Sequence, residues 1–128
     1  MSGAPAIRKR IVVAEDDPAI AGMLQKVLAQ HYDVALARDG HQAIALASSP
    51  PKPSLLLLDV MMPGIDGHGV ATELRKNPEL KAVPIIFLTA KSGATDVIKG
   101  IQSGARHYIT KPFKLEDVLA KVKKVLGG

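Results

Sequence analysis

The chain has 128 residues, of which 47% are hydrophobic and 23% charged, a size and composition that suit one compact domain with its own core. Because it has no cysteine, it can hold no disulfide, thiolate metal site or cysteine nucleophile, and no apolar run approaches the roughly 20 residues of a membrane-spanning helix, so we expect a cytoplasmic protein. The net charge of +5 is modest, three of the positive charges fall on Arg8, Lys9 and Arg10, and aromatic residues are too few for base stacking, so we expect neither nucleic-acid nor membrane binding.

The first part of the chain predicts a strand, a helix and a second strand. The apolar run 11–14 ends at Glu15 and is typical of a buried strand. Pro18 then begins a helix. Five apolar residues recur in it at helical spacing and should line one buried face: Ile20, Met23, Leu24, Val27 and Leu28. Residues 32–37 predict the second strand.

The middle of the chain predicts a short helix and a fully buried strand. Asp39 and Gly40 mark a turn, and the helix that follows, around Ala43, Ile44 and Ala47, ends in the loop 48–53. Residues 55–58 are four consecutive leucines, as expected of a parallel strand covered on both faces. This apolar run stops abruptly at Asp59.

The last part of the chain predicts helices over 66–76 and 95–103 and strands over 84–88 and 106–110. The final helix has one apolar stripe and ends at Gly127. The stripe consists of Leu115, Val118, Leu119, Val122, Val125 and Leu126, whereas Lys121, Lys123 and Lys124 should face solvent.

Five strands that alternate with five helices indicate an α/β fold with an open, doubly wound parallel sheet. Ligands in such folds gather at the carboxyl ends of the strands. Four of the predicted strands end in a polar group that such a site can use. These groups are Glu15 and Asp16 after the first strand, Asp59 after the third, Thr89 after the fourth and Lys111 after the fifth.

These strand ends predict a cation site with phosphoryl-transfer chemistry. Two unit charges 4 Å apart repel by about 4 kcal/mol at an effective dielectric of about 20, so clustered carboxylates need a cation or a retained proton. The available ligands are oxygens, which favours magnesium, or manganese, over zinc. A carboxylate-bound metal with Lys111 opposite balances phosphoryl charge during in-line transfer, and Asp59 could be the nucleophile.

Four separated motifs carry a resemblance to a known family. They are EDD at 15–17, DVMMPGIDG at 59–67, TA at 89–90 and YITKPF at 108–113. Together they resemble response regulator receiver domains of two-component signal transduction, the CheY-like superfamily, and the likeness spans nearly the whole chain. Each motif follows a predicted strand, and their order makes the combination specific.

The resemblance implies a flavodoxin-like five-stranded sheet in the order 2-1-3-4-5, with a receiver domain at 10–126 after an N-terminal tail at 1–9. It implies a phosphorelay phosphoprotein in which Asp59 becomes 4-aspartylphosphate. Glu15, Asp16, Asp59 and the backbone carbonyl of Met61 would hold Mg²⁺. Thr89 and Lys111 would contact the phosphoryl oxygens, and Thr89 and Tyr108 would form the switch.

The resemblance also implies partners and a peptide geometry. A sensor histidine kinase or phosphotransfer protein would supply the phosphoryl group, and an output protein or attached output domain would read the last helices and strand. The domain would be a monomer or a phosphorylation-dependent dimer, with no enzymatic activity beyond self-phosphorylation and self-dephosphorylation. The bond between Lys111 and Pro112 would be cis.

Several residues also have a purely structural interpretation. Asp17 and Asp66 are expected to cap helices, and Gly67 should serve backbone geometry. The four histidines have no metal-ligand spacing and are expected at the surface: His31, His41, His68 and His107. Arg106 and His107 stand where many receivers carry an acidic pair, which would affect partner choice.

Two other functions compete with the phosphoacceptor. One is a metal-dependent phosphatase with an aspartyl-phosphate intermediate, but haloacid-dehalogenase-like enzymes usually carry a second Asp two residues after the nucleophile, and here that position is Met61. The other is a receiver-like interaction module that never takes phosphate. The intact set of acidic, hydroxyl and lysine residues counts against it.

Overall fold

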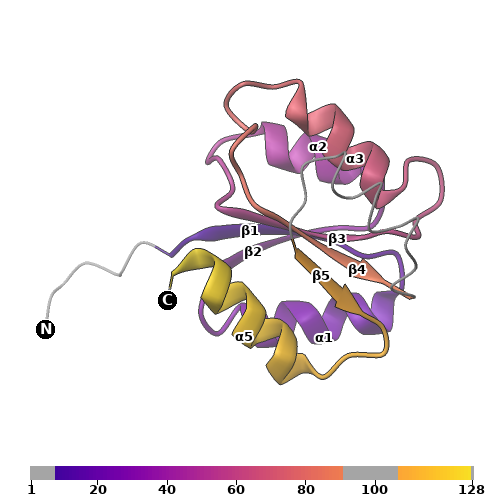
Figure 1. Ribbon diagram of the computed structural model, residues 1–128, viewed down its shortest axis with the longest axis vertical. Helices are drawn as coiled ribbons and strands as arrows, with labels where there is room; N and C mark the ends of the chain where they lie inside the picture. The colour runs from indigo at the N-terminus through magenta and orange to yellow at the C-terminus, as the bar shows by residue number, and fades with distance from the viewer. Residues whose placement is uncertain (1–7, 91–106, 128) are drawn as a thin grey trace, which may run out of the picture.

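Five parallel strands form one sheet in the computed structural model, which describes residues 8–90 and 107–127 (Figure 1). The strands are β1 (Arg10–Ala14), β2 (Asp33–Ala37), β3 (Leu55–Asp59), β4 (Ile85–Thr89) and β5 (His107–Thr110). Their order in the sheet, β2-β1-β3-β4-β5, confirms the predicted topology. Since all neighbours are parallel, the five carboxyl ends lie along one edge of the sheet.

Helices cover both faces of the sheet. They are α1 (Pro18–Leu28), α2 (Gly40–Ser48), α3 (Gly67–Arg75) and α5 (Leu115–Leu126). The pair α1 and α5 packs on one face and the pair α2 and α3 on the other, as Figure 1 shows. The helix predicted over 95–103 lies outside the described residues. No helix within the described ranges has the length and apolar character needed to cross a membrane.

The leucine run of β3 is buried on both sides, which explains its lack of polar alternation. Leu56 and Leu58 belong to the cluster beneath α2 and α3, whereas Leu55 and Leu57 belong to the cluster beneath α1 and α5. All four side chains are fully buried. A strand in the middle of such a sheet must therefore be apolar at every position until it reaches the edge, where Asp59 begins the site.

Three aspartates begin helices just beyond the carboxyl edge. The Oδ1 atom of Asp17 accepts hydrogen bonds from the backbone N–H groups of Ala19 and Ile20 at the start of α1. Asp66 accepts from the N–H of Gly69 at the start of α3, so both predicted caps are confirmed. Asp39 caps α2 in the same way through the N–H of Gln42.

Asp39 and Gly40 were predicted as a turn, and the structure corrects this. Asp39 is the cap of α2 and Gly40 is its first residue. A β-carbon on Gly40 would lie 2.5 Å from the carbonyl oxygen of Ile65, so glycine is needed here for close packing between α2 and the loop before α3. A turn and a capped helix start share the same residue preferences, which is why the dipeptide alone did not separate them.

Burial differs from the expectation at five side chains, one of which is His107, expected at the surface but half-buried. Met23 is 48% exposed, and Ala21 is buried in α1 instead. His68, expected at the surface, is only 8% exposed and packs edge-on against Phe87, with ring centroids 4.6 Å apart. Lys124 faces solvent as predicted, whereas Lys121 and Lys123 are half-buried.

Candidate functional site

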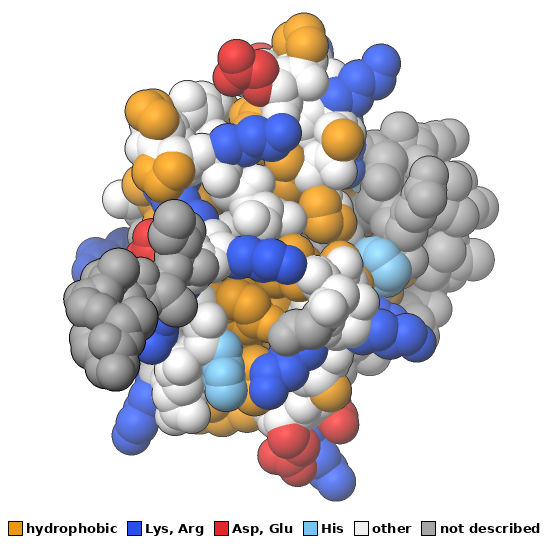
Figure 2. Space-filling view, turned by 90° about the vertical axis from the view of Figure 1, so that its left-hand side faces the viewer, with side chains coloured by type: hydrophobic (Ala, Val, Ile, Leu, Met, Phe, Trp, Pro, Cys, Tyr) orange, Lys and Arg blue, Asp and Glu red, His pale blue; other side chains and the backbone are white. Residues whose placement is uncertain are grey.

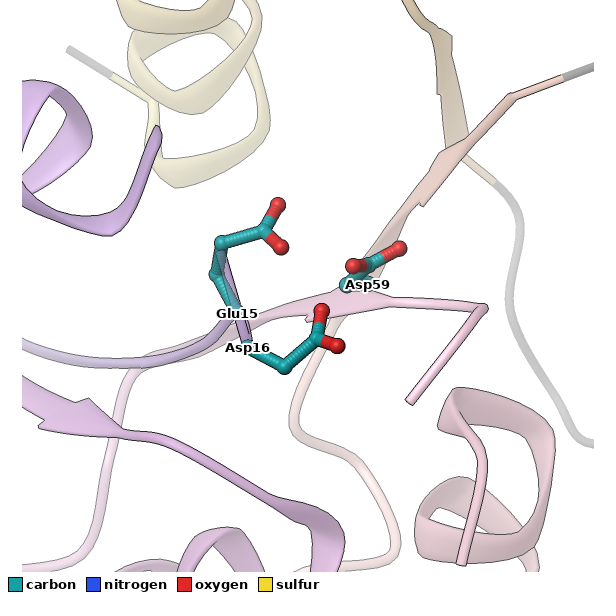
Figure 3. Close-up of side chains that lie close together, drawn as sticks. All are labelled: Glu15, Asp16 and Asp59. Carbon is teal, nitrogen blue, oxygen red and sulfur yellow. The ribbon is translucent and has the colours of Figure 1, made fainter. Parts of the chain in front are cut away.

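The carboxyl edge of the sheet brings three carboxylates together. Glu15 and Asp16 directly follow β1, and Asp59 is the last residue of the adjacent strand β3. One carboxylate oxygen from each residue lies within 4.8 Å of the others, and Figure 3 shows the side chains turned toward a common point. Glu15 and Asp59 are buried and Asp16 is exposed. The cluster therefore opens to solvent on the Asp16 side.

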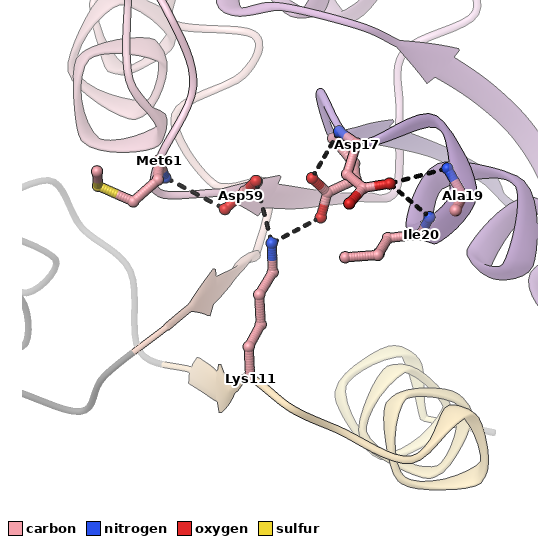
Figure 4. Close-up of polar contacts among 7 residues, drawn as sticks. Asp17, Ala19, Ile20, Asp59, Met61 and Lys111 are labelled. Atoms are coloured by element: carbon pink, nitrogen blue, oxygen red, sulfur yellow. Dashed lines mark hydrogen bonds and ion pairs between the residues drawn. The ribbon is translucent and has the colours of Figure 1, made fainter.

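Lys111 reaches this cluster from the loop after β5, which is an edge strand of the sheet. It directly follows β5, and its Nζ atom lies 2.9 Å from Oε1 of Glu15 and 3.1 Å from Oδ2 of Asp59 (Figure 4). The Lys111 side chain is 21% exposed, while the two carboxylates are almost completely buried. The peptide bond between Lys111 and Pro112 is cis, as predicted.

Two backbone amides complete the surroundings of the buried carboxylates. The N–H of Asp17 donates to Oε2 of Glu15 at 3.2 Å, and the N–H of Met61 donates to Oδ1 of Asp59, also at 3.2 Å (Figure 4). Each donor lies two residues after its acceptor, in the loop that follows β1 or β3. Sequence reasoning did not find these contacts, because any residue type except proline supplies a backbone N–H.

Burial and Glu15 raise the pKa of Asp59, whereas Lys111 lowers it. Desolvation has the largest effect, and together with the hydrogen bond and negative charge of Glu15 it raises the pKa of Asp59 to about 7. Lys111 acts against this rise through its own hydrogen bond and charge. Burial lowers the pKa of Lys111, but Glu15 and Asp59 outweigh it, so the pKa of Lys111 is raised overall.

Gly67 holds the loop after β3 against the backbone of Asp59. Its N–H donates to the carbonyl oxygen of Val60 at 3.0 Å. A β-carbon on Gly67 would lie 2.5 Å from the carbonyl oxygen of Asp59 and 3.0 Å from Cα of Val60, and backbone atoms cannot move away as a flexible side chain can. The prediction that this glycine serves backbone geometry is confirmed.

Thr89 and Tyr108 lie on the two strands beyond Asp59. Thr89 ends β4, is almost fully buried, and its carbonyl accepts a hydrogen bond of 2.6 Å from the N–H of Lys111. Tyr108, on β5, is half-buried and packs beside the ring of Phe87, with centroids 5.8 Å apart. The register of β4 and β5 pairs Phe87 with Tyr108 and Thr89 with Thr110. Thr89 and Tyr108 therefore lie on the predicted fourth and fifth strands.

The donor set of this site fits a hard divalent cation. Glu15, Asp16 and Asp59 offer only oxygen atoms, which Mg²⁺ and Mn²⁺ prefer, and two of these carboxylates are buried, where uncompensated negative charge is costly. Met61 lies beside the cluster and contacts Asp59 through its N–H, while its side chain is 70% exposed. The metal role of the Met61 carbonyl stays a prediction.

Comparison with known proteins gives a consistent result. The family model described as response regulator receiver domain matches residues 11–123. The DNA-binding response regulator MtrA of Mycolicibacterium smegmatis is 43% identical over 118 residues, which cover 91% of this chain and 50% of that protein. This chain therefore spans about half the length of that curated relative.

Solved structures share the same fold. The chemotaxis protein CheY4 of Vibrio cholerae superimposes with a TM-score of 0.88 at 27% identity, covering 94% of this chain and 99% of that one. The signal receiver domain of a signal transduction histidine kinase from Syntrophus aciditrophicus gives a TM-score of 0.83 at 34% identity, covering 94% and 91%. Both likenesses cover 94% of this chain.

Proposed function

Because the chain belongs to the response regulator receiver domain family of two-component systems, we propose that Asp59 is its phosphoacceptor. The observation that carries this proposal is the contact of Lys111 with both Glu15 and Asp59 inside one cluster of carboxylates. Asp59 is the only one of the three carboxylates that is the last residue of a strand, and its strand lies between β1 and β4.

In the proposed reaction an oxygen of the Asp59 carboxylate forms a bond to phosphorus. The bond from phosphorus to the donor breaks at the same time, and a phosphohistidine donor leaves as an imidazole that takes up a proton. The product is an acyl phosphate on Asp59. Lys111 would then hold one phosphoryl oxygen through its ammonium group, and the Thr89 hydroxyl would donate to another.

Magnesium is the cation that we propose for the site, with manganese as a substitute. Glu15, Asp16 and Asp59 would hold it, with the Met61 carbonyl as a further ligand, and when bound it would neutralise negative charge on the transferring group. The arrangement of two buried carboxylates and one exposed carboxylate supports this, because the open side leaves room for the phosphoryl donor.

The output would follow from a two-state equilibrium around β5. A phosphoryl group on Asp59 would draw Thr89 toward it, and Tyr108, which packs beside Phe87, would swing inward. A sensor histidine kinase or phosphotransfer protein would supply the phosphoryl group, and an output protein or domain would read the changed face. Residues 10–126 would form the receiver domain, without turnover of external substrates.

The proposal is tested by incubating the protein with magnesium and acetyl phosphate and measuring its intact mass. We expect one added phosphoryl group per chain in the wild type and in Asp39→Asn, a helix-cap variant in which asparagine can still cap. Asp59→Asn should gain none. A mass gain that persists in Asp59→Asn would contradict the assignment.

A second measurement separates a phosphoacceptor from a phosphatase. The protein is mixed with an excess of a chromogenic phosphate ester and magnesium, and released product is counted per chain. We expect no sustained release, because the proposed role is a single stoichiometric transfer. Continued turnover that requires Asp59 would favour the phosphatase alternative instead.

A further inference from the structure

A row of three hollows, called the furrow below, crosses the amino-terminal edge of the sheet, at the opposite end of the strands from Asp59. It consists of three adjoining hollows of about 890, 320 and 570 Å³. The first two share Lys52 and Ser54, and the second and third share the segment Ala82, Val83 and Pro84. The furrow therefore runs from the start of β1 and β2, past β3 and β4, to the end of α5.

The furrow is strongly basic. Its lining includes seven Lys or Arg residues and a single acidic residue, Asp33. Figure 2 views the molecule from this side and shows blue side chains spread across the whole face. The chain as a whole has 17 basic and 12 acidic residues, so the excess of positive charge is concentrated here.

Part of this charge has a structural explanation. The Nη1 atom of Arg10 donates to the carbonyl oxygens of Leu46, Ser49 and Pro51, which holds the loop before β3 in place. Arg75 does the same for the loop before β4, and Arg8 and Lys9 each donate to a carbonyl oxygen near the end of a helix. These four residues stabilise loops and chain ends, and they need no ligand to account for them.

Three lysines of the furrow have no such explanation. Lys52, Lys81 and Lys124 are exposed, and within residues 8–90 and 107–127 none of them donates a hydrogen bond or forms an ion pair. Lys52 lies where the first and second hollows join, and Lys81 and Lys124 line the third. They are therefore distributed along the furrow with their ammonium groups available to a partner.

The furrow is also lined by apolar residues. Val34 lines the first hollow, Val83 and Pro84 line the second and third, and Val125 lines the third. In Figure 2 an orange strip lies between the blue side chains in the middle of the face. A ligand that used only charge would leave this apolar surface unused.

We propose that the furrow binds an acidic peptide segment of a partner protein, with carboxylates on the three lysines and apolar side chains on the strip between them. An extended peptide of about ten residues spans the diameter of a small domain, about 30 Å, and so matches a furrow that crosses the sheet edge. A nucleic-acid duplex would contact the lysines through its phosphates and would leave the apolar strip unused. Single strands bind through stacking, and the described lining offers only Tyr32, which is buried, and His107 as rings.

The test is a titration of ¹⁵N-labelled protein, without magnesium, with a peptide of about ten residues in which Glu and Asp alternate with Leu and Ser. We expect amide shift changes at Ser54, Val83 and Val125 and none at Asp59 or Met61. A peptide of equal charge with Ser at every Leu should bind several-fold more weakly. Shift changes confined to the carboxyl edge, or none at all, would overturn the proposal.

A charge-reversed variant gives an independent readout by fluorescence anisotropy with the labelled peptide. Replacing Lys52, Lys81 and Lys124 by Glu should weaken binding about tenfold or more. The matched control also introduces three Glu residues, at positions that are exposed and line none of the hollows: Lys26, Arg38 and Lys114. This control should weaken peptide binding less than threefold. An equal loss of peptide affinity in both variants would indicate attraction to net charge alone and would overturn the proposal. An oligothymidylate of equal charge that bound more tightly than the peptide would also overturn it.

Discussion

At the scale of single residues, Lys111 balances the buried charge at the carboxyl edge. Glu15 and Asp59 are both almost completely buried, and the Lys111 ammonium lies within 3.1 Å of an oxygen of each. Two buried carboxylates beside each other repel, so the energy of the site depends on this one shared cation whenever no metal is bound. Lys111 also lowers the pKa of Asp59, but burial and Glu15 outweigh it and raise that pKa to about 7.

Lys111→Met should therefore destabilise the metal-free protein. Removing the cation leaves two buried carboxylates facing each other, at a cost of about 2 kcal/mol after allowance for the partial exposure of Lys111. The measurement is the free energy of unfolding in urea with a chelator present. The control Lys114→Met, at an exposed neighbouring lysine, should change it by less than about 0.5 kcal/mol. Equal values for both variants would contradict the charge-balance account.

Asp59→Asn should change how stability depends on pH. Folding raises the pKa of Asp59 from 3.8 to about 7, so between these values the folded state holds more protons than the unfolded state, and the free energy of unfolding falls as pH rises. The variant lacks this loss. The free energy of unfolding of Asp59→Asn, relative to that of wild type, should therefore rise between about pH 4 and pH 7, by up to about 4 kcal/mol, and then level off.

The check on this prediction is urea unfolding of both proteins in chelator at pH 4, 5.5, 7 and 8. A constant difference across the series would mean that Asp59 ionises alike in the folded and unfolded chains. Magnesium should reduce the difference above pH 6, since the metal binds the ionised carboxylate.

At the scale of elements, the loop between β3 and α3 is held by backbone contact. Gly67 begins α3 and lies directly against the carbonyl of Asp59, while the Asp66 side chain caps the same helix. The start of α3 therefore fixes where the backbone of Asp59 lies, and helix packing and site geometry are coupled at this junction.

Gly67→Ala should damage both stability and the site. The added β-carbon would approach backbone atoms to 2.5 Å, and relief requires a shift of the loop, at about 2 kcal/mol or more. Gly22→Ala is the matched control, because Gly22 lies in α1 with nothing within 4 Å of its added β-carbon. That variant should gain about 0.5–1 kcal/mol from helix propensity.

Thermal unfolding and phosphorylation by acetyl phosphate provide the two readouts for this glycine pair. Gly67→Ala should unfold at a lower temperature and be phosphorylated more slowly than wild type. Gly22→Ala should unfold at a higher temperature and be phosphorylated at the wild-type rate. A Gly67→Ala protein as stable as wild type would show that the loop moves freely and would disprove the proposed coupling.

At the scale of the whole molecule, the two ends of the sheet serve different chemistry. The carboxyl edge carries the acidic cluster and Lys111, and the amino-terminal edge carries the basic furrow. The core lies between them in two layers, one on each face of the sheet. A ligand at the carboxyl edge that links β1 to β3 must stabilise the fold as a whole, since it binds only when both strands are in place.

Magnesium should thus raise the melting temperature of the protein. At a concentration about 100 times its Kd, a ligand specific for the folded state adds about 2.7 kcal/mol, which for a domain of this size is a rise of several degrees. Asp16→Ala should remove most of this rise, whereas Asp33→Ala, at the opposite edge, should preserve it. An unchanged response in Asp16→Ala would mean that the metal binds elsewhere.

The order of residue types along the chain was sufficient to predict which segments form the sheet and which residues end its strands. Strand runs such as Leu55–Leu58, and the polar groups that follow them, are local properties that can be read along the chain, and parallel topology then brings strand ends to one edge. Which side chains meet was settled by the packing of these elements in three dimensions. The pairing of Lys111 with both Glu15 and Asp59, and the burial of His68 against Phe87, depend on contacts between separate elements, which hydrophobic periodicity does not encode. The exposure of Met23 and the close approach of Gly40 and Gly67 to the backbone of neighbouring loops likewise depend on how the elements pack.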